Sequence, residues 1–407
     1  MDNLTLRHVT IFQPDGTQTA AQDCQIVTGK FAQIHAAKHT QKDTSSPTSA
    51  DVEGAWLLPL LWDIAPQRTF AKSELQFAPS LGIGHAGCQR QLQCTRFDTG
   101  HTATVYPIAP LLTFSAGSNR PTPADTLALK KSGHVGLSLA YSDVIHWDAC
   151  HIAFLWAAQA GLRVFVDHLS QVGNRHPSLR CEQLGIPTCS AHAEEFAVYQ
   201  LLSLAEKTGC TLHLGNLSSA RAVALLGDAQ QRGVNATGGV AIQHLFFEDG
   251  DCLDFDSRFH ECPPYRTLNG RNTLRTGLKD GVLSVISANH RPLPLSVKDT
   301  PYTQSAPGSS TWDIYLNLAI KLIREEILPA QCVIPALTKN PAALLGQQSE
   351  LIQEGSAAQF ILIHPERGGI VSPERWLSAG KNTPLTGSHL PGQRIGIYHQ
   401  AWHELVK

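Results

Sequence analysis

Polar side chains that could bind a metal ion follow three short apolar segments in the middle of the chain. They are Asp167 and His168, then Asn216, then Asn289 and His290. A hydrolytic zinc site takes three protein ligands, mainly imidazole nitrogens and carboxylate oxygens, and leaves a fourth position for water. An amide oxygen is a poor zinc ligand because it brings no charge. The set therefore offers at most a weak metal site from Asp167, His168 and His290, or hydrogen-bonded residues that bind no metal.

A fourth segment ends without any such residue. The stretch "LLPLLWDIAPQR" (57–68) is typical of a buried strand with a polar exit. Many metal-dependent hydrolases carry two histidines, spaced H-x-H, where such a strand ends. Here those places hold Ala65 and Gln67. The sequence therefore predicts either a different kind of strand or a metal site that has lost its ligands.

Two other pairs have spacings that could do chemistry. His399 and His403 have the i, i+4 spacing of a helix, but the glutamate and third ligand of a metalloprotease helix are missing, so we expect no metal there. Glu194 and Glu195 open a predicted helix, where acidic side chains favour the helix dipole. We interpret both glutamates as structural.

The elements that must position these residues alternate between strands and helices. The predicted strands are 162–166, 210–214 and 282–286, and the predicted helices are 193–209, 219–233 and 311–329. Such alternation over about 290 residues favours an α/β fold, a (β/α)8 TIM barrel, with a doubly wound sheet as the alternative. Chemistry in such barrels lies at the carboxyl ends of the strands. These ends are where the candidate residues stand.

Local signals set the expected helix limits. In the helix 193–209, apolar residues recur at helical spacing, and Gly209 ends the pattern. The apolar residues are Phe196, Val198, Leu201, Leu202 and Ala205. Ser218 is the expected cap of the next helix, and Pro329 the expected end of the helix that starts at 311.

The two ends of the chain are expected to form one small β-domain. Segments 4–12 and 24–35 have the character of strands, and 38–54 that of a loop. Segments 355–369 and 394–407 complete the same unit. The predicted domains are therefore 1–54 with 355–407, and a barrel over 55–354.

Composition excludes several classes of protein. The chain has 407 residues, of which 42% are hydrophobic and 16% charged, and its net charge is -2. These values suit a globular protein and argue against nucleic acid or an anionic membrane as partner. No apolar run approaches the roughly 20 residues of a membrane span, and the first residues lack a signal-peptide core. With ten cysteines and no C-x-x-C pair, we expect a cytoplasmic protein with reduced thiols.

Two long stretches resemble the dihydroorotase family of cyclic amidohydrolases. They are "GIPTCSAHAEEFAVYQLLSLAEKTGCTLHLGNLSSARAVAL" (185–225) and "ECPPYRTLNGRNTLRTGLKDGVLSVISANHRP" (261–292). The resemblance spans roughly residues 50 to 365. It implies a TIM barrel with a small β-domain and, in active members, a zinc site that opens and closes the dihydropyrimidine ring in pyrimidine synthesis.

The resemblance implies that the zinc site has been lost. The family's H-x-H falls on Ala65 and Gln67, its second L-H-I-x-H histidine on Asn216, and its aspartate general base on Asn289. The positions that bind the substrate in the family also differ. Its arginine falls on Thr69, beside Arg68, and its asparagines fall on Ile108 and Cys262. Among the remaining metal positions, the bridging residue falls near Leu139 and Ala140, the H-C-E-D histidine on Asp167 or His168, and a last histidine on Leu293. The residues that remain are His213, His290, Pro263, Pro264 and Arg266.

These losses predict a protein that is not an enzyme and has no cofactor. Asn289 cannot accept the proton that a carboxylate would take, and without zinc a water molecule keeps its bulk pKa near 16 rather than about 7. Similar pseudo-dihydroorotases support the assembly and activity of aspartate carbamoyltransferase, and the resemblance implies the catalytic chain of that enzyme as partner, in a dodecamer with six chains of each kind. Candidate contact regions are 69–95 and 291–310.

Two alternatives stay open. The first is an active cyclic amidohydrolase with a rearranged or metal-free site. The second is a ligand-sensing subunit in which Arg68 and Arg266 bind an anion in the vacated pocket.

Overall fold

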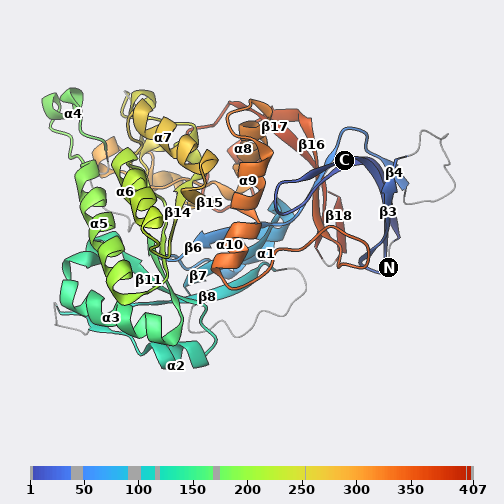
Figure 1. The fold of residues 1–407 in the computed structure, drawn as a ribbon. Helices are drawn as coiled ribbons and strands as arrows, with labels where there is room; N and C mark the ends of the chain where they lie inside the picture. Colours follow the sequence, from blue (N-terminus) through green and yellow to red (C-terminus); the bar gives the residue numbers. More distant parts are fainter. Residues whose placement is uncertain are drawn as a thin grey trace.

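In the computed structural model, eight parallel strands form the sheet at the centre of the larger part of the molecule (Figure 1). The structure describes residues 3–37, 49–89, 102–114, 120–167, 175–252, 254–399 and 401–404. Neighbouring strands pair in sequence order from first to last. The strands are β6 (Leu61–Ala65), β7 (Ile83–Gln89), β8 (Thr104–Pro110), β11 (Gly136–Ala140), β12 (Arg163–Asp167), β13 (Leu212–Leu214), β14 (Ala236–Ala241) and β15 (Leu283–Ser287).

The first and last of these strands approach each other and nearly close a barrel. Asp63 of β6 accepts a hydrogen bond from the backbone N–H of Ala288, directly after β15, at 2.9 Å. Its second oxygen accepts the indole N–H of Trp312 at 2.7 Å. This buried carboxylate therefore ties both ends of the sheet to the helix that contains Trp312. The predicted TIM-like barrel is confirmed.

Helices surround the barrel, and their limits correct three local expectations. They are α1 (Lys72–Phe77), α2 (Thr126–Lys131), α3 (Trp147–Ala160), α4 (Leu179–Gln183), α5 (Ala191–Thr208), α6 (Ala220–Gln231), α7 (Leu268–Lys279), α8 (Trp312–Arg324), α9 (Ala330–Leu337) and α10 (Lys339–Leu344). The cap of α6 is Ser219, not Ser218, because the Ser219 side chain accepts the Ala222 N–H. Helix α8 ends at Arg324, well before Pro329. Phe196 lies on the exposed side of α5.

A second sheet contains strands from both ends of the chain, as expected. Its strands are β1 (Leu4–Phe12), β2 (Gln18–Val27), β3 (Lys30–Ala36), β4 (Ser49–Asp51), β5 (Trp56–Leu58), β16 (Gln359–Ile370), β17 (His389–His399) and β18 (Ala401–Glu404). The stretch 24–35 is not one strand, because Thr28 and Gly29 take positive φ angles and turn the chain between β2 and β3. Likewise 394–407 divides between β17 and β18. A short ribbon of β9 (Leu112–Thr113) and β10 (Thr122–Pro123) lies apart from both sheets.

Apolar side chains fill the barrel interior. One cluster joins Trp62 of β6, Ile108 of β8, Phe165 of β12 and Val285 of β15. Because these strands lie on different sides of the barrel, the cluster occupies its inside, and residues of α10 pack against it. Within the described residues, no helix is long and apolar enough to cross a membrane.

Candidate functional site

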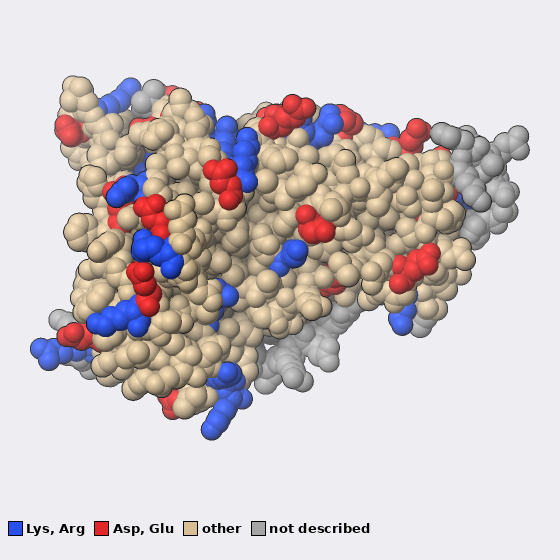
Figure 2. Space-filling view, in the orientation of Figure 1, with Lys and Arg blue, Asp and Glu red and all other residues tan. Residues whose placement is uncertain are grey.

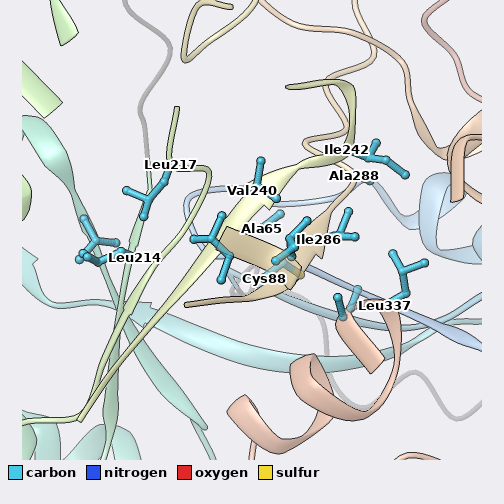
Figure 3. Close-up of a cluster of buried hydrophobic side chains, with 14 of the residues drawn as sticks. Ala65, Cys88, Leu214, Leu217, Val240, Ile242, Ile286, Ala288 and Leu337 are labelled. Carbon is cyan, nitrogen blue, oxygen red and sulfur yellow. The ribbon is translucent and has the colours of Figure 1, made fainter. Parts of the chain in front are cut away.

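The end of β6 holds no metal-binding side chain. Ala65 is buried in the main hydrophobic cluster, beside its sheet partner Cys88 (Figure 3). Gln67 is half-buried, and its Oε1 lies 3.5 Å from the Gln89 amide nitrogen, which also donates to Ser138 Oγ at 3.2 Å. A methyl group and an amide that faces another amide therefore occupy these two positions.

Asp167 and Asn216 come together, as expected for neighbouring strand ends, but they bind each other. The Asn216 amide nitrogen donates to Asp167 Oδ1 at 2.8 Å. The Asn216 oxygen accepts the hydroxyl of Ser287, at the end of β15. Asn216 has a φ of 49°, a left-handed conformation that asparagine tolerates better than most residues. The three side chains form a buried hydrogen-bonded bridge across β12, β13 and β15.

Asn289 is held by a glutamate that the sequence analysis did not identify. Its amide nitrogen donates to Glu261 Oε1 at 3.2 Å and to the Cys262 carbonyl at 3.1 Å. Glu261 is almost fully buried, and this burial raises the pKa of its carboxyl group against the opposing charges of Lys298 and Arg291. Burial also lowers the pKa of Lys298 to about 8. The sequence signal that could have identified Glu261 is its position directly before "CPPYR", a stretch that resembles the family.

His290 caps a helix with one ring nitrogen, Nδ1, while its other nitrogen, Nε2, lies 3.6 Å from Glu74 Oε1. Its Nδ1 accepts the backbone N–H groups of Thr311 at 3.0 Å and Trp312 at 3.2 Å, at the start of α8. The ring stacks on the Trp312 indole, with 4.5 Å between centroids. Burial lowers the pKa of His290, so the neutral ring is favoured. The imidazole thus satisfies two N–H groups that a helix start leaves without a partner.

Arg266 is engaged with residues of the α5–α6 region. Its guanidinium donates to Ser218 Oγ at 3.1 Å and to the Cys189 carbonyl at 2.5 Å, and lies 3.8 Å from Glu194 Oε2. Glu194 itself accepts the backbone N–H groups of Ser218 and Ser219 at 2.9 and 3.0 Å. Glu194 therefore stabilises the start of α6, in addition to any effect on its own helix. This geometry leaves Arg266 no role as an anion receptor.

The other histidines also have structural surroundings. His213 Nδ1 lies 2.9 Å from Thr237 Oγ1, and burial, aided by the Arg163 charge, lowers the pKa of His213 to about 3. His399 and His403 lie on the adjacent strands β17 and β18, so their i, i+4 spacing does not place them on one face of a helix. His168 falls outside the described residues.

Arg68 keeps a charged group near the barrel mouth. Burial lowers the pKa of Arg68 to about 10, and the nearby Arg291 acts in the same direction, opposed by Glu74 and Glu261. The next residue, Thr69, is exposed. Arg68 is therefore the one residue of the predicted anion pair that stays compatible with such a role.

The members of the predicted donor set that the structure describes, Asp167 and His290, do not fit a zinc ion. Among the described residues, no group of three or more His, Cys, Asp and Glu side chains is arranged to hold a metal. Asp167 faces the Asn216 amide, and His290 directs one nitrogen to α8. Asp167 can reach an ion only by giving up a buried hydrogen bond, and the neutral His290 ring, whose Nδ1 accepts two N–H groups, carries its proton on Nε2.

Two dihydroorotase-like proteins of other organisms decide the family. A dihydroorotase-like protein of Pseudomonas putida is 31% identical over 292 residues, covering 71% of this chain and 68% of the relative. A dihydroorotase-like protein of Pseudomonas aeruginosa is 31% identical over 299 residues, covering 72% and 69%. The chain belongs to the dihydroorotase-like family. A dihydroorotase of an Anaeromyxobacter species is 30% identical over 309 residues, covering 74% of this chain and 71% of that protein.

Solved structures of cyclic amidohydrolases share the fold. The L-hydantoinase of Arthrobacter aurescens superposes with a TM-score of 0.78 at 16% identity, covering 100% of this chain and 98% of that one. A dihydropyrimidinase of Brevibacillus agri gives 0.75 at 18% identity, with 98% and 95% covered. No family model matches the chain. The family and the barrel are thus established by independent comparisons.

Proposed function

We propose that this dihydroorotase-like chain is a catalytically inactive subunit that supports the assembly and activity of aspartate carbamoyltransferase in de novo pyrimidine synthesis. The observation that carries the proposal is the state of the strand ends. There, the described residues Asp167, Asn216 and Asn289 are hydrogen-bonded to other protein groups, and Ala65 lies in the hydrophobic core.

The loss of chemistry is supported by more than missing ligands. At the position of the general base, Asn289 donates to Glu261, a group that would repel an aspartate placed there. Asn216 bridges Asp167 and Ser287, so a hydrogen-bonded network with a single carboxylate replaces the ligands of a metal site. Each replacement has gained a partner. A protein adapted in this way keeps its barrel stable without a zinc ion.

The partner is inferred from the family resemblance. The residues that build the barrel and its helix starts are retained, including Glu194 with Ser218 and Ser219 at the start of α6. A scaffold that resembles the family, without the residues of its reaction, suits a subunit that acts through its outer surface. Of the two regions considered as contacts, residues 90–95 fall outside the described residues, while several residues of 291–310 are buried against the barrel.

The test compares the carbamoyltransferase catalytic chain with and without this protein. We expect the two chains to co-elute and sediment as one complex, and the catalytic chain alone to lose assembly and activity. The variant Asp167→Asn serves as a matched control, because it removes the carboxylate that remains among the candidate residues at the strand ends. This variant should support the catalytic chain to the same extent as the wild-type protein does. A catalytic chain that is equally assembled and active by itself would refute the proposal.

A further inference from the structure

Arg68 places a guanidinium at the carboxyl end of the barrel without a protein group to bind it. Its backbone is fixed, because the Arg68 N–H donates to the Ala65 carbonyl at 2.9 Å and the Arg68 carbonyl accepts the Gln89 N–H at 2.7 Å. Among the described residues, the Arg68 side chain forms no hydrogen bond and no ion pair. Burial lowers the pKa of Arg68 to about 10, so the guanidinium has lost much of its water. A buried charge without an opposite charge in contact is unfavourable, and a bound anion relieves this cost.

Arg291 brings a second guanidinium to the same end of the barrel. Arg68 follows β6 and Arg291 follows β15, and these two strands meet where Asp63 accepts the Ala288 N–H. The Arg291 side chain is buried, and its backbone N–H donates to the Ser309 carbonyl at 2.7 Å. The charge of Arg291 lowers the pKa of Arg68, so the two guanidiniums lie close enough to interact. Two loops with fixed backbones therefore hold two like charges together.

The acidic groups around this pair are committed to other donors. One oxygen of Glu74 accepts a backbone N–H at 2.7 Å, and the other lies 3.6 Å from His290 Nε2. Asp63 and Glu261 accept the hydrogen bonds described above. Burial raises the pKa of Asp63 and of Glu261, which weakens both as counter-charges. The carboxylates near Arg68 therefore do not neutralise it by contact.

The visible surface offers anions little general attraction. The net charge of the chain is -2. On the face that Figure 2 shows, acidic and basic side chains are interspersed and most of the surface is uncharged. Anions collect on a protein where charge of one sign is concentrated. Binding of an anion to this protein therefore requires a specific site.

We propose that Arg68 and Arg291 form a binding site for the oxyanion group of a small molecule, a carboxylate or a phosphate. A guanidinium can donate two parallel hydrogen bonds to either group, and the second arginine adds a further positive charge. The positions that the family resemblance assigns to substrate binding are different ones and hold Thr69, Ile108 and Cys262. The site goes beyond the proposed support of the carbamoyltransferase and does not depend on it, because it needs no second chain.

The first test is calorimetric titration of the full-length protein alone with sodium phosphate and with sodium succinate, at pH 7 and constant ionic strength. Sodium chloride is the reference titrant. We expect saturable binding of at least one probe, and the probe that binds shows which oxyanion group the site takes. Arg68→Gln should raise the dissociation constant at least about tenfold, and Arg68→Lys several-fold, because lysine keeps the charge without the planar fork. Arg367→Gln, which changes an exposed arginine of β16, is the matched control and should bind as the wild type does.

The melting temperature separates a binding site from a structural role of Arg68. Without a probe, Arg68→Gln should melt at the wild-type temperature or above, because it removes a buried charge that no carboxylate contacts. At ten times the dissociation constant, the probe should raise the melting temperature of the wild type by about 1 °C or more and leave that of Arg68→Gln unchanged. The proposal would be overturned by a wild-type protein that binds neither probe, or by a dissociation constant that Arg68→Gln leaves unchanged. An Arg68→Gln variant that melts well below the wild type without a probe would assign Arg68 to the fold and also overturn it.

Discussion

Acid is expected to destabilise the protein through His213, a histidine that the family resemblance retains. Its pKa of about 3 in the folded protein lies below the ordinary value of 6.5 because of burial. Below pH 6.5, His213 is therefore protonated in the unfolded chain but stays neutral in the folded chain. The stabilisation is complete above pH 6.5 and falls as the pH drops toward 3, by about 1.4 kcal/mol per pH unit.

The variant His213→Gln isolates this contribution. Between pH 7 and pH 5, protonation of His213 in the unfolded state alone lowers the free energy of unfolding by about 2 kcal/mol. Glutamine does not titrate and can still hydrogen-bond to Thr237, so the difference between the two pH values should shrink by about that amount.

Urea unfolding at pH 7 and pH 5, followed by circular dichroism, measures the effect. His389→Gln, which replaces an exposed histidine of β17, is the matched control and should leave the difference unchanged. If His213→Gln kept the full pH dependence of the wild type, His213 would accept its proton in the folded state. The assignment of His213 as a neutral structural group would then be wrong.

Three further changes test the buried polar contacts by their effect on the free energy of unfolding in urea. Asp63→Ala leaves two buried N–H groups without an acceptor, so the free energy of unfolding should fall by about 3 kcal/mol or more. A loss below about 1 kcal/mol would mean that the barrel does not depend on the contact between Asp63 and the residues after β15. Glu194→Gln should lower the free energy of unfolding by about 2 kcal/mol, because Arg266 then lies buried without its carboxylate. The control Glu195→Gln should lower it by less than about 1 kcal/mol. Equal losses in the two variants would contradict the role given to Glu194. Asn289→Asp should cost about 2–4 kcal/mol at pH 7 by setting a second carboxylate against Glu261, and a neutral or stabilising effect would show that the pocket accepts a general base.

The sequence predicted the architecture well because periodicity and turn residues are local. Alternating strands and helices indicated the barrel, and strand character at both ends indicated the shared sheet. Boundaries were less accurate. The stretch 57–68 divides into β5 and β6, which belong to different sheets, because Pro59 and Leu60 lie between them and a proline cannot donate to a sheet.

The candidate site was predictable only where residue type decides. Ala65 and Asn289 cannot serve as a zinc ligand or a general base, whatever their surroundings. The partners of these residues could not be predicted, because they come from distant parts of the chain. Asn289 meets Glu261, and His290 meets the start of α8 at Thr311. The exposed apolar side chains of α3 were not predicted either, because no helix was predicted for residues 147–160.

The most direct test of the central claim is the turnover of dihydroorotate by the full-length protein, purified and assayed with added zinc. The account predicts no formation of carbamoyl aspartate above the rate in buffer. Turnover that depends on zinc and disappears in Asp167→Ala would contradict it, and would mean that the strand ends still assemble a working metal site.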